Sequence, residues 1–186
     1  MRSRTTLFDR AVRELSQAVN RIDEAGVQRL VERISDARHV SVFGCGREGL
    51  QIRGFAMRLF HLGRSVSVVG DMTTPRIGPG DLFLVTAGPG TLPTALALVG
   101  VARTAGARVM CITADPGGAV PRDCDDVLVL PAQTMTTNQG NGASSLPMGS
   151  VYEGGLFLLF EIAVLELKRK LGISDQTMRA NHTNLE

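Results

Sequence analysis

The sequence contains no tryptophan and one tyrosine, and aromatic residues make up 4% of its 186 residues. A surface that stacks nucleic-acid bases needs several such rings. The net charge of +2 provides no electrostatic footprint for a polyanion. The sequence also has no uninterrupted apolar run of the roughly 18 residues that would span a membrane. We therefore predict that this chain binds neither nucleic acid nor membrane.

Cysteine is scarce as well. Cys45, Cys111 and Cys124 form an odd set without the spacing of metal ligands, and no HExxH motif or CxxC pair occurs. We expect no metal site and a reducing, cytoplasmic compartment. The N-terminal segment carries charges through its apolar stretch and lacks a small-residue cleavage site. It is therefore expected to be a helix and not a signal peptide.

The remaining pattern is that of an α/β protein. Short, nearly continuous apolar runs are typical of strands buried on both faces, and here they alternate with helical spacing. The length suits one domain with a full core. This alternation predicts a parallel sheet with right-handed crossovers and a ligand at the carboxyl ends of its strands. Strands are expected near 40–43, 66–69, 82–86, 108–113 and 126–130, and helices near 6–22, 23–37, 48–61, 93–105, 118–123 (a short turn) and 151–170.

Several helix boundaries carry their own signals. Thr6 precedes the first helix with Asp9 three residues on, and Asp23 is placed to cap the second. Gly63 and Gly106 stand where C′ glycines belong.

The first candidate loop lies within the segment HVSVFGCGREGLQIRG, residues 39–54, where a strand turns through glycines into a helix. Backbone N–H groups at such a helix start are a natural seat for an anion. The spacing also fits G-x-G-x-x-G, with Asp71 following 22 residues after the last glycine, so dinucleotide binding is a minor alternative. Glycines in such a turn are also common for steric reasons alone. The loop comprises Gly44, Cys45, Gly46, Arg47, Glu48 and Gly49.

A second glycine-rich turn joins another strand to a helix, and Pro93 can occupy its first helical turn. It is either a plain tight turn or a second anion cradle that faces the first. Its candidate binding residues are Ala87, Gly88, Pro89, Gly90, Thr91 and Thr94.

A third loop, residues 134–150, is long, small and polar, which is typical of functional loops and of disordered ones. It includes Asn138, Gln139 and Asn141. Glu153 follows in the first turn of the last long helix, where a carboxylate serves either as a dipole partner or as a general base.

Four segments together resemble the SIS (sugar isomerase) domain, and within it the 6-phospho-3-hexuloisomerase group. Residues 43–63 resemble the group's GxGRSGLVAKAFAMRLMHLG, and 69–75 its VGExxTP. Residues 146–153 resemble its PxGTxFE signature, and 178–186 its xxRHAxLE tail. The resemblance covers nearly the whole chain and is specific in the combination of blocks.

The resemblance implies a three-layer fold with five parallel strands in flavodoxin-like order 2-1-3-4-5. It also implies a homotetramer or dimer with shared sites, and cofactor-free aldose–ketose isomerisation through a cis-enediol. Glu153 matches the proton-shuttling glutamate, His182 the tail histidine that assists ring opening or holds the sugar, and Arg47 an arginine on substrate oxygens. The expected single SIS domain, 1–186, divides into a helical extension 1–38, an α/β core 39–172, and a C-terminal helix and tail 173–186.

The chain departs from this family in its loops. Where the family's phosphate loop reads SGSGETTS, this chain reads AGPGTLPT, which loses hydroxyls and, at its prolines, backbone N–H donors. Cys45 and Glu48 replace serines of the first loop. Either the phosphate is held weakly or elsewhere, or the sugar lacks one and is bound by polar residues such as Ser144 and Ser145. A non-catalytic sugar-sensing module is the second hypothesis.

Overall fold

The computed structural model describes residues 6–137 and 144–185; Asn138, Gln139 and Asn141 lie outside these ranges. Its helices and strands are α1 (Leu7–Val19), α2 (Glu24–Asp36), β1 (Val40–Gly44), α3 (Gly46–His61), β2 (Val66–Val68), β3 (Leu82–Thr86), α4 (Pro93–Thr104), β4 (Arg108–Thr113), α5 (Ala119–Arg122), β5 (Asp126–Val129), α6 (Ser150–Leu171) and α7 (Asp175–Ala180).

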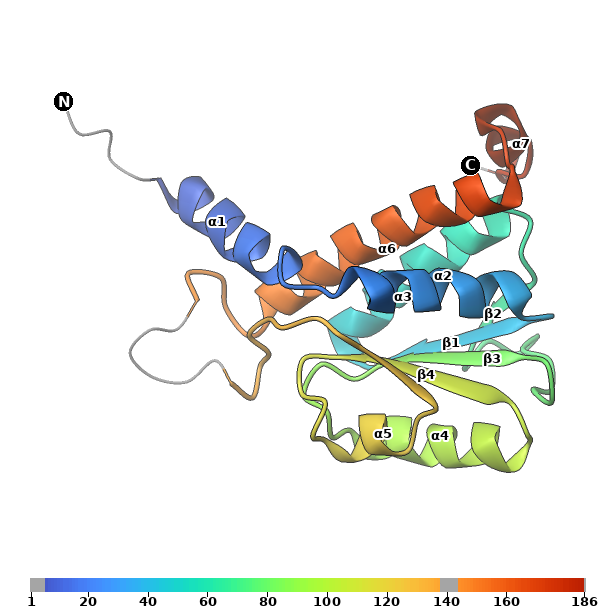
Figure 1. Ribbon diagram of the computed structural model, residues 1–186, viewed down its shortest axis with the longest axis horizontal. Coiled ribbons are helices and arrows are strands. Elements are labelled where there is room, and N and C mark those ends of the chain that lie inside the picture. The colour runs from blue at the N-terminus through green and yellow to red at the C-terminus, as the bar shows by residue number, and fades with distance from the viewer. Residues whose placement is uncertain (1–5, 138–143, 186) are drawn as a thin grey trace.

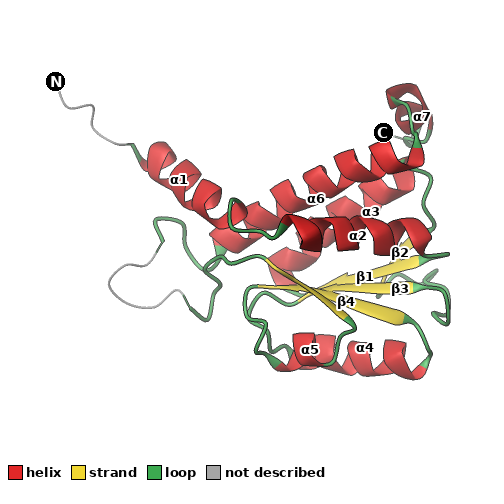
Figure 2. Cartoon of the chain, viewed as in Figure 1, coloured by secondary structure: helices red, strands yellow, loops and turns green. Residues whose placement is uncertain are grey.

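The strands form one parallel sheet in the order β2-β1-β3-β4-β5, with helices on both faces (Figures 1 and 2). The α/β class predicted from the sequence pattern and the strand order implied by the family resemblance are both confirmed. β1 and β3 pair in register from Val40 with Leu82 to Gly44 with Thr86. These two strands therefore end level with each other. The strand order reverses between them, because β2 lies beyond β1 on one side and β4 and β5 lie beyond β3 on the other.

Each face of the sheet has its own core because side chains alternate along a strand. In β3, Leu82 and Leu84 pack in a cluster with α2, α3 and α6, whereas Phe83 and Val85 pack in a cluster with α4. Helices α3 and α6 are joined by the stacked rings of Phe55 and Phe160, whose centroids lie 4.3 Å apart. No helix in the described part of the chain has the length and apolarity that crossing a membrane requires.

The expected helix signals are present. Thr6 and Asp9 form a capping box at α1, and the Asp23 carboxylate accepts hydrogen bonds from the N–H groups of Ala25 and Gly26 at α2. Gly63 and Gly106 have φ values of 73° and 83° after α3 and α4, a conformation that glycine adopts without steric cost.

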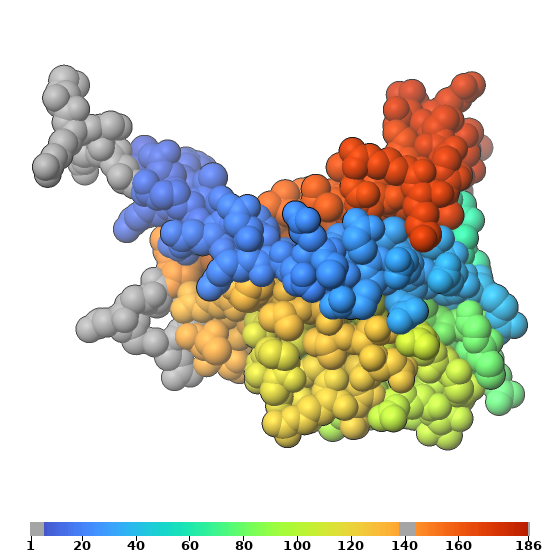
Figure 3. All heavy atoms as spheres, in the orientation of Figure 1, coloured from blue at the N-terminus to red at the C-terminus, as the bar shows by residue number. Residues whose placement is uncertain are grey.

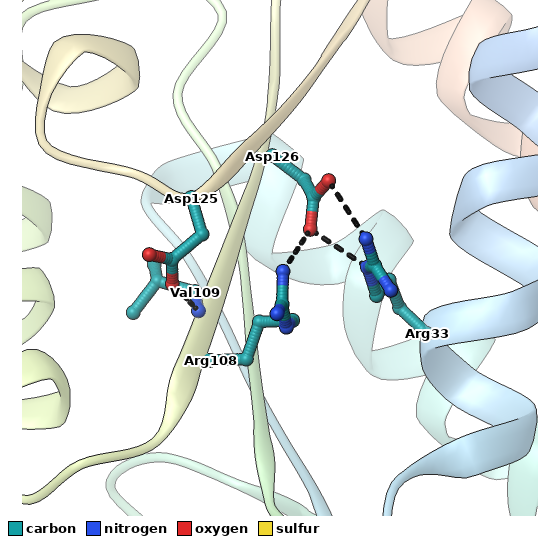
Figure 4. A network of polar contacts seen from close by, with 5 residues as sticks. All are labelled: Arg33, Arg108, Val109, Asp125 and Asp126. Carbon is teal, nitrogen blue, oxygen red and sulfur yellow. Dashed lines mark hydrogen bonds and ion pairs between the residues drawn. The ribbon is translucent and has the colours of Figure 1, made fainter.

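A polar network lies at the amino ends of β4 and β5 (Figure 4). It is on the side of the sheet opposite the carboxyl ends of β1 and β3. Asp126 accepts a hydrogen bond from Arg33 Nε of α2 at 2.8 Å and lies 3.3 Å from Arg108 Nη1. Its neighbour Asp125 accepts a hydrogen bond of 2.7 Å from the N–H of Val109. Burial acts to raise the pKa of Asp126, but hydrogen bonds from both arginines outweigh it and lower the pKa below its ordinary value.

We expect Asp126→Asn to reduce the free energy of unfolding by roughly 1–3 kcal/mol at pH 7, because two guanidinium groups lose a largely buried partner. Since the folded-state pKa of Asp126 is lowered, its contribution is present above the unfolded pKa and disappears as the pH falls through the folded one. Urea unfolding at pH 7 and in mild acid measures both effects. The control Asp123→Asn breaks a half-exposed 3.8 Å pair with Arg103 and is expected to cost under about 0.5 kcal/mol; equal losses would contradict the assignment.

Candidate active site

Among the helices that begin at the carboxyl edge of the sheet without a side-chain cap are α3, α4 and α6. Their N-cap residues are Cys45 for α3, Leu92 for α4 and Gly149 for α6, and none makes a capping side-chain hydrogen bond. Backbone N–H groups in the first turn of such helices are left to other partners, and the helix dipoles make this region electropositive.

A cavity of about 310 Å³ lies among these helix starts. It is where a parallel sheet of this strand order is expected to hold a ligand. The side chains that give it charge are Arg47, Glu48 and Glu153. The lining residues are Cys45, Gly46, Arg47, Glu48, Pro89, Leu92, Thr134, Met135, Met148, Gly149, Tyr152 and Glu153.

Close packing brings the loops together. A Cβ on Gly49 would lie 2.6 Å from the carbonyl oxygen of Gly44, and one on Gly88 would lie 2.8 Å from the Tyr152 ring. The buried Tyr152 hydroxyl donates a 2.9 Å hydrogen bond to the carbonyl of Ile112 in β4. The start of α6 is thereby fixed to the sheet beside the second glycine loop.

Arg47 holds Glu153 at the cavity. Its Nε lies 3.0 Å from a Glu153 carboxylate oxygen, Nη1 donates to Ser150 Oγ at 3.2 Å, and Nη2 donates to the carbonyl of Met148 at 2.7 Å. Met148 has a φ of 52°, which is unusual outside glycine. Burial raises the pKa of Glu153, and the charge and hydrogen bond of Arg47 oppose that rise.

Glu48 reaches across to the second loop. The N–H of Gly88 donates to both oxygens of its carboxylate, at 3.1 and 3.0 Å. Burial raises the pKa of Glu48 to about 7, and the negative charge of Glu153 adds to the rise, while the hydrogen bond from Gly88 opposes it. Two carboxyl groups in unlike environments can hold different protonation states, which is the arrangement used for acid and base roles.

The second loop has few N–H groups to offer a ligand. Those of Ala87 and Gly90 are donated to the carbonyls of Ile112 and Ala87. Pro89 lines the cavity, whereas Ala87, Gly88, Gly90, Thr91 and Thr94 are not among its lining residues. Thr91 Oγ1 instead accepts a hydrogen bond of 3.2 Å from the N–H of Ala119 at the start of α5.

The candidate serines lie against another element. The carboxylate of Glu14 in α1 accepts hydrogen bonds from the hydroxyl of Ser144 and from the hydroxyl and N–H of Ser145, the last two at 2.6 and 3.0 Å. Ser144 and Glu14 line a separate cavity. These bonds lower the pKa of Glu14, with Ser144 the largest cause. Neither serine is among the residues that line the cavity of Glu153.

His182 also lies apart from Glu153 within one chain. It follows α7, and its ring stands 4.8 Å from that of His61 at the end of α3. Glu153 is in the first turn of α6 and His182 comes after its last turn; 22 helical residues span about 33 Å. Figure 1 shows α7 at the far end of α6 from the third loop.

Tyr152 and Met148 line the cavity and were not singled out by the sequence analysis. Neither was Glu14, which binds the two serines beside a separate cavity. Tyr152 carried a signal, since it is the chain's one tyrosine and adjoins Glu153. Glu14 carried none, because it comes from a helix far away in the sequence. Asp71, the acidic residue of the dinucleotide pattern, lies 3.5 Å from Arg53 in an exposed pair.

Comparison with known proteins identifies the family. Residues 33–154 match the SIS domain, and the chain belongs to this family. It is 35% identical to a 3-hexulose-6-phosphate isomerase of Mycobacterium gastri over 93% of this chain and 86% of that protein. It is 33% identical to one of Methylomonas aminofaciens, over 94% and 96%. A Methanococcus jannaschii crystal structure, from which the function of 3-hexulose-6-phosphate isomerase was inferred, aligns with a TM-score of 0.83 and 26% identity over 96% and 98% of the two chains.

We expect Glu48→Gln to flatten the pH dependence of stability. A carboxyl whose pKa rises on folding is held protonated in the folded state, so its ionisation destabilises the fold as the pH increases. With a folded pKa of about 7 against 4.5, the wild type should lose about 2–3 kcal/mol more than the variant between pH 5 and 8. Urea unfolding at four pH values measures this, with the exposed Glu32→Gln as the matched control. Parallel curves for wild type and Glu48→Gln would contradict the raised pKa.

Proposed function

We propose that this protein is an aldose–ketose isomerase of the SIS family that acts on a sugar or sugar phosphate, with Glu153 as the proton-transferring base. The observation that carries the proposal is the position of the Glu153 carboxylate. It faces a cavity at the head of α6 and is held 3.0 Å from Arg47. The relatives named 3-hexulose-6-phosphate isomerase support the reaction class.

The chemistry needs one carboxylate that reaches two adjacent carbons. Ionised Glu153 takes the proton from the carbon beside the sugar carbonyl, the C–H electron pair forms the C=C bond of a cis-enediol, and the carbonyl oxygen gains a proton. The proton on Glu153 then returns to the former carbonyl carbon. The hydroxyl of the other carbon gives up its proton, which replaces the one that the first oxygen gained from solvent, and that carbon becomes the new carbonyl. The sugar is both oxidised and reduced, so no external electron carrier takes part.

The surroundings of Glu153 suit this role. Partial burial raises its pKa and so strengthens it as a base, while Arg47 keeps it ionised. The uncapped starts of α3 and α6 direct N–H groups and positive dipole ends toward the cavity. Such donors stabilise the negative charge that develops on the enediol oxygens.

The protein is also proposed to form a homo-oligomer, with a dimer or tetramer as the expected states. Large apolar side chains stay exposed on α1, α3 and α6 in a single chain. Figures 1 and 3 show α1 projecting from the body beside the head of α6. Phe8 is 84% exposed, Val12 66% and Phe60 57%. Burying such a surface against a second copy stabilises association. A second copy could also bring its tail near the cavity, which would give His182 a role that one chain does not provide.

The expected compartment remains the cytoplasm, because Cys45, Cys111 and Cys124 are all unpaired. The proposal includes no metal or cofactor.

Glu153→Gln is expected to fold normally and to lose isomerisation by about two to four orders of magnitude, because the amide cannot accept the proton. The measurement is exchange, in deuterated water, of the proton on the carbon beside the carbonyl (C2 of an aldose, C1 of a 2-ketose), followed by NMR for free sugars and for sugar phosphates. The matched control is Glu166→Gln, in the same helix but paired with Arg169 near its other end, and it should keep full exchange. Normal exchange in Glu153→Gln would remove the assignment. If a sugar binds the wild type without any exchange, the protein is a non-catalytic sugar-binding module.

The double substitution Phe8→Ser and Val12→Ser is expected to shift the protein to a smaller oligomer while each chain keeps its fold, because both side chains are exposed in a single chain. Light scattering with size-exclusion chromatography measures the mass. The control is Met72→Ser, an apolar residue that is 99% exposed in a loop. An unchanged mass in the double variant would exclude α1 from the contact.

A further inference from the structure

The Glu48 carboxylate occupies a backbone donor of the second glycine loop. Both of its carboxylate oxygens accept from the N–H of Gly88, the residue at the centre of the second glycine loop. A helix start or glycine loop binds phosphate through such N–H groups. Here the group bound is a side chain of the protein, supplied from the first turn of α3.

The neighbouring donors are also occupied. The N–H groups of Ala87 and Gly90 donate to backbone carbonyls, and Pro89 and Pro93 have none. The Arg47 guanidinium is committed through Nε to Glu153, through Nη1 to Ser150 and through Nη2 to Met148. A phosphate that approached the second loop would have to displace Glu48 or break these backbone contacts to obtain a donor from that loop.

The net charge of the cavity also disfavours a phosphate group. The ionisable residues that line the cavity, apart from Cys45 and Tyr152, are Arg47, Glu48 and Glu153. With both carboxyl groups ionised, the net charge of these three side chains is −1. Phosphate carries about −1.5 to −2 near neutral pH, and like charges in a partly buried site repel strongly.

We infer that Glu48 is a specificity-determining residue that fills the anion seat of this cavity, so that the protein accepts a sugar whose bound end is a neutral polyol and disfavours one that ends in phosphate. The inference rests on the proposed function for the sugar itself, but not on catalysis. It distinguishes this chain from relatives that are named for a 6-phosphate substrate. Hydroxyl groups suit the cavity because they can donate to Glu48 and Glu153, which a phosphate dianion cannot do.

The test replaces Glu48 by Ser, which frees the N–H of Gly88 and removes one negative charge. Inorganic phosphate is titrated into the full-length protein at pH 7.5 and constant ionic strength, and binding is followed by calorimetry. We expect the variant to bind phosphate about ten- to a hundredfold more tightly than the wild type, as one recovered charge-assisted hydrogen bond and one removed repulsion allow. Glu32→Ser removes an exposed negative charge of α2 instead and should behave as the wild type.

A second experiment tests whether Glu48 also determines the preference between a sugar and its phosphate. Fructose and fructose 6-phosphate are compared as a matched pair by thermal shift on the same proteins. Glu48→Ser should raise the shift from fructose 6-phosphate relative to that from fructose. Saturable phosphate binding by the wild type at the variant's affinity overturns the inference. So does a Glu48→Ser protein that binds no more phosphate than the wild type, since another group would then close the seat.

Glu48→Gln keeps most of the side-chain volume and serves if Glu48→Ser does not fold. It should give a smaller gain in the same direction, and no gain would also overturn the inference. Phosphate binding does not require turnover. Failure of this test and failure of the isomerase assignment, which is judged by proton exchange in Glu153→Gln, are therefore separate results.

Discussion

The ion pair between Arg47 and Glu153 joins the start of α3 to the start of α6, and the candidate site depends on it. Arg47 also binds Ser150 and the carbonyl of Met148. One guanidinium therefore fixes the turn that begins α6 and orients the carboxylate that we propose as the base. Without this contact α6 would still pack through its apolar face and Tyr152 would still bind Ile112, but the Glu153 carboxylate would lose the partner that orients it.

A second contact changes the chemistry of the same cavity. The Glu48 carboxylate is bound by the N–H of Gly88 and lies close to Tyr152 and Glu153. The family scaffold is retained in full, with its parallel sheet and strand order. The difference in ligand preference that we infer rests on a few loop residues, as expected when function depends on sites carried by a common fold.

The separation of the other candidate residues has a topological cause. Helix α6 carries the chain from the cavity to the far end of the molecule, so the tail with His182 emerges beside His61. Ser144 and Ser145 follow the third loop but are bound by Glu14 of α1.

The sequence by itself determined the fold. Buried runs such as 82–86 and 108–113, caps at Thr6 and Asp23, and glycines at 63 and 106 are local signals, and local signals specify strands, helices and their ends. It also indicated both glycine turns and Glu153. Only the tertiary structure decided that Glu48 binds Gly88 and that Ser144 and Ser145 bind Glu14. Such contacts join residues 40 or more positions apart, and their partners are chosen by how the elements pack and not by any spacing along the chain.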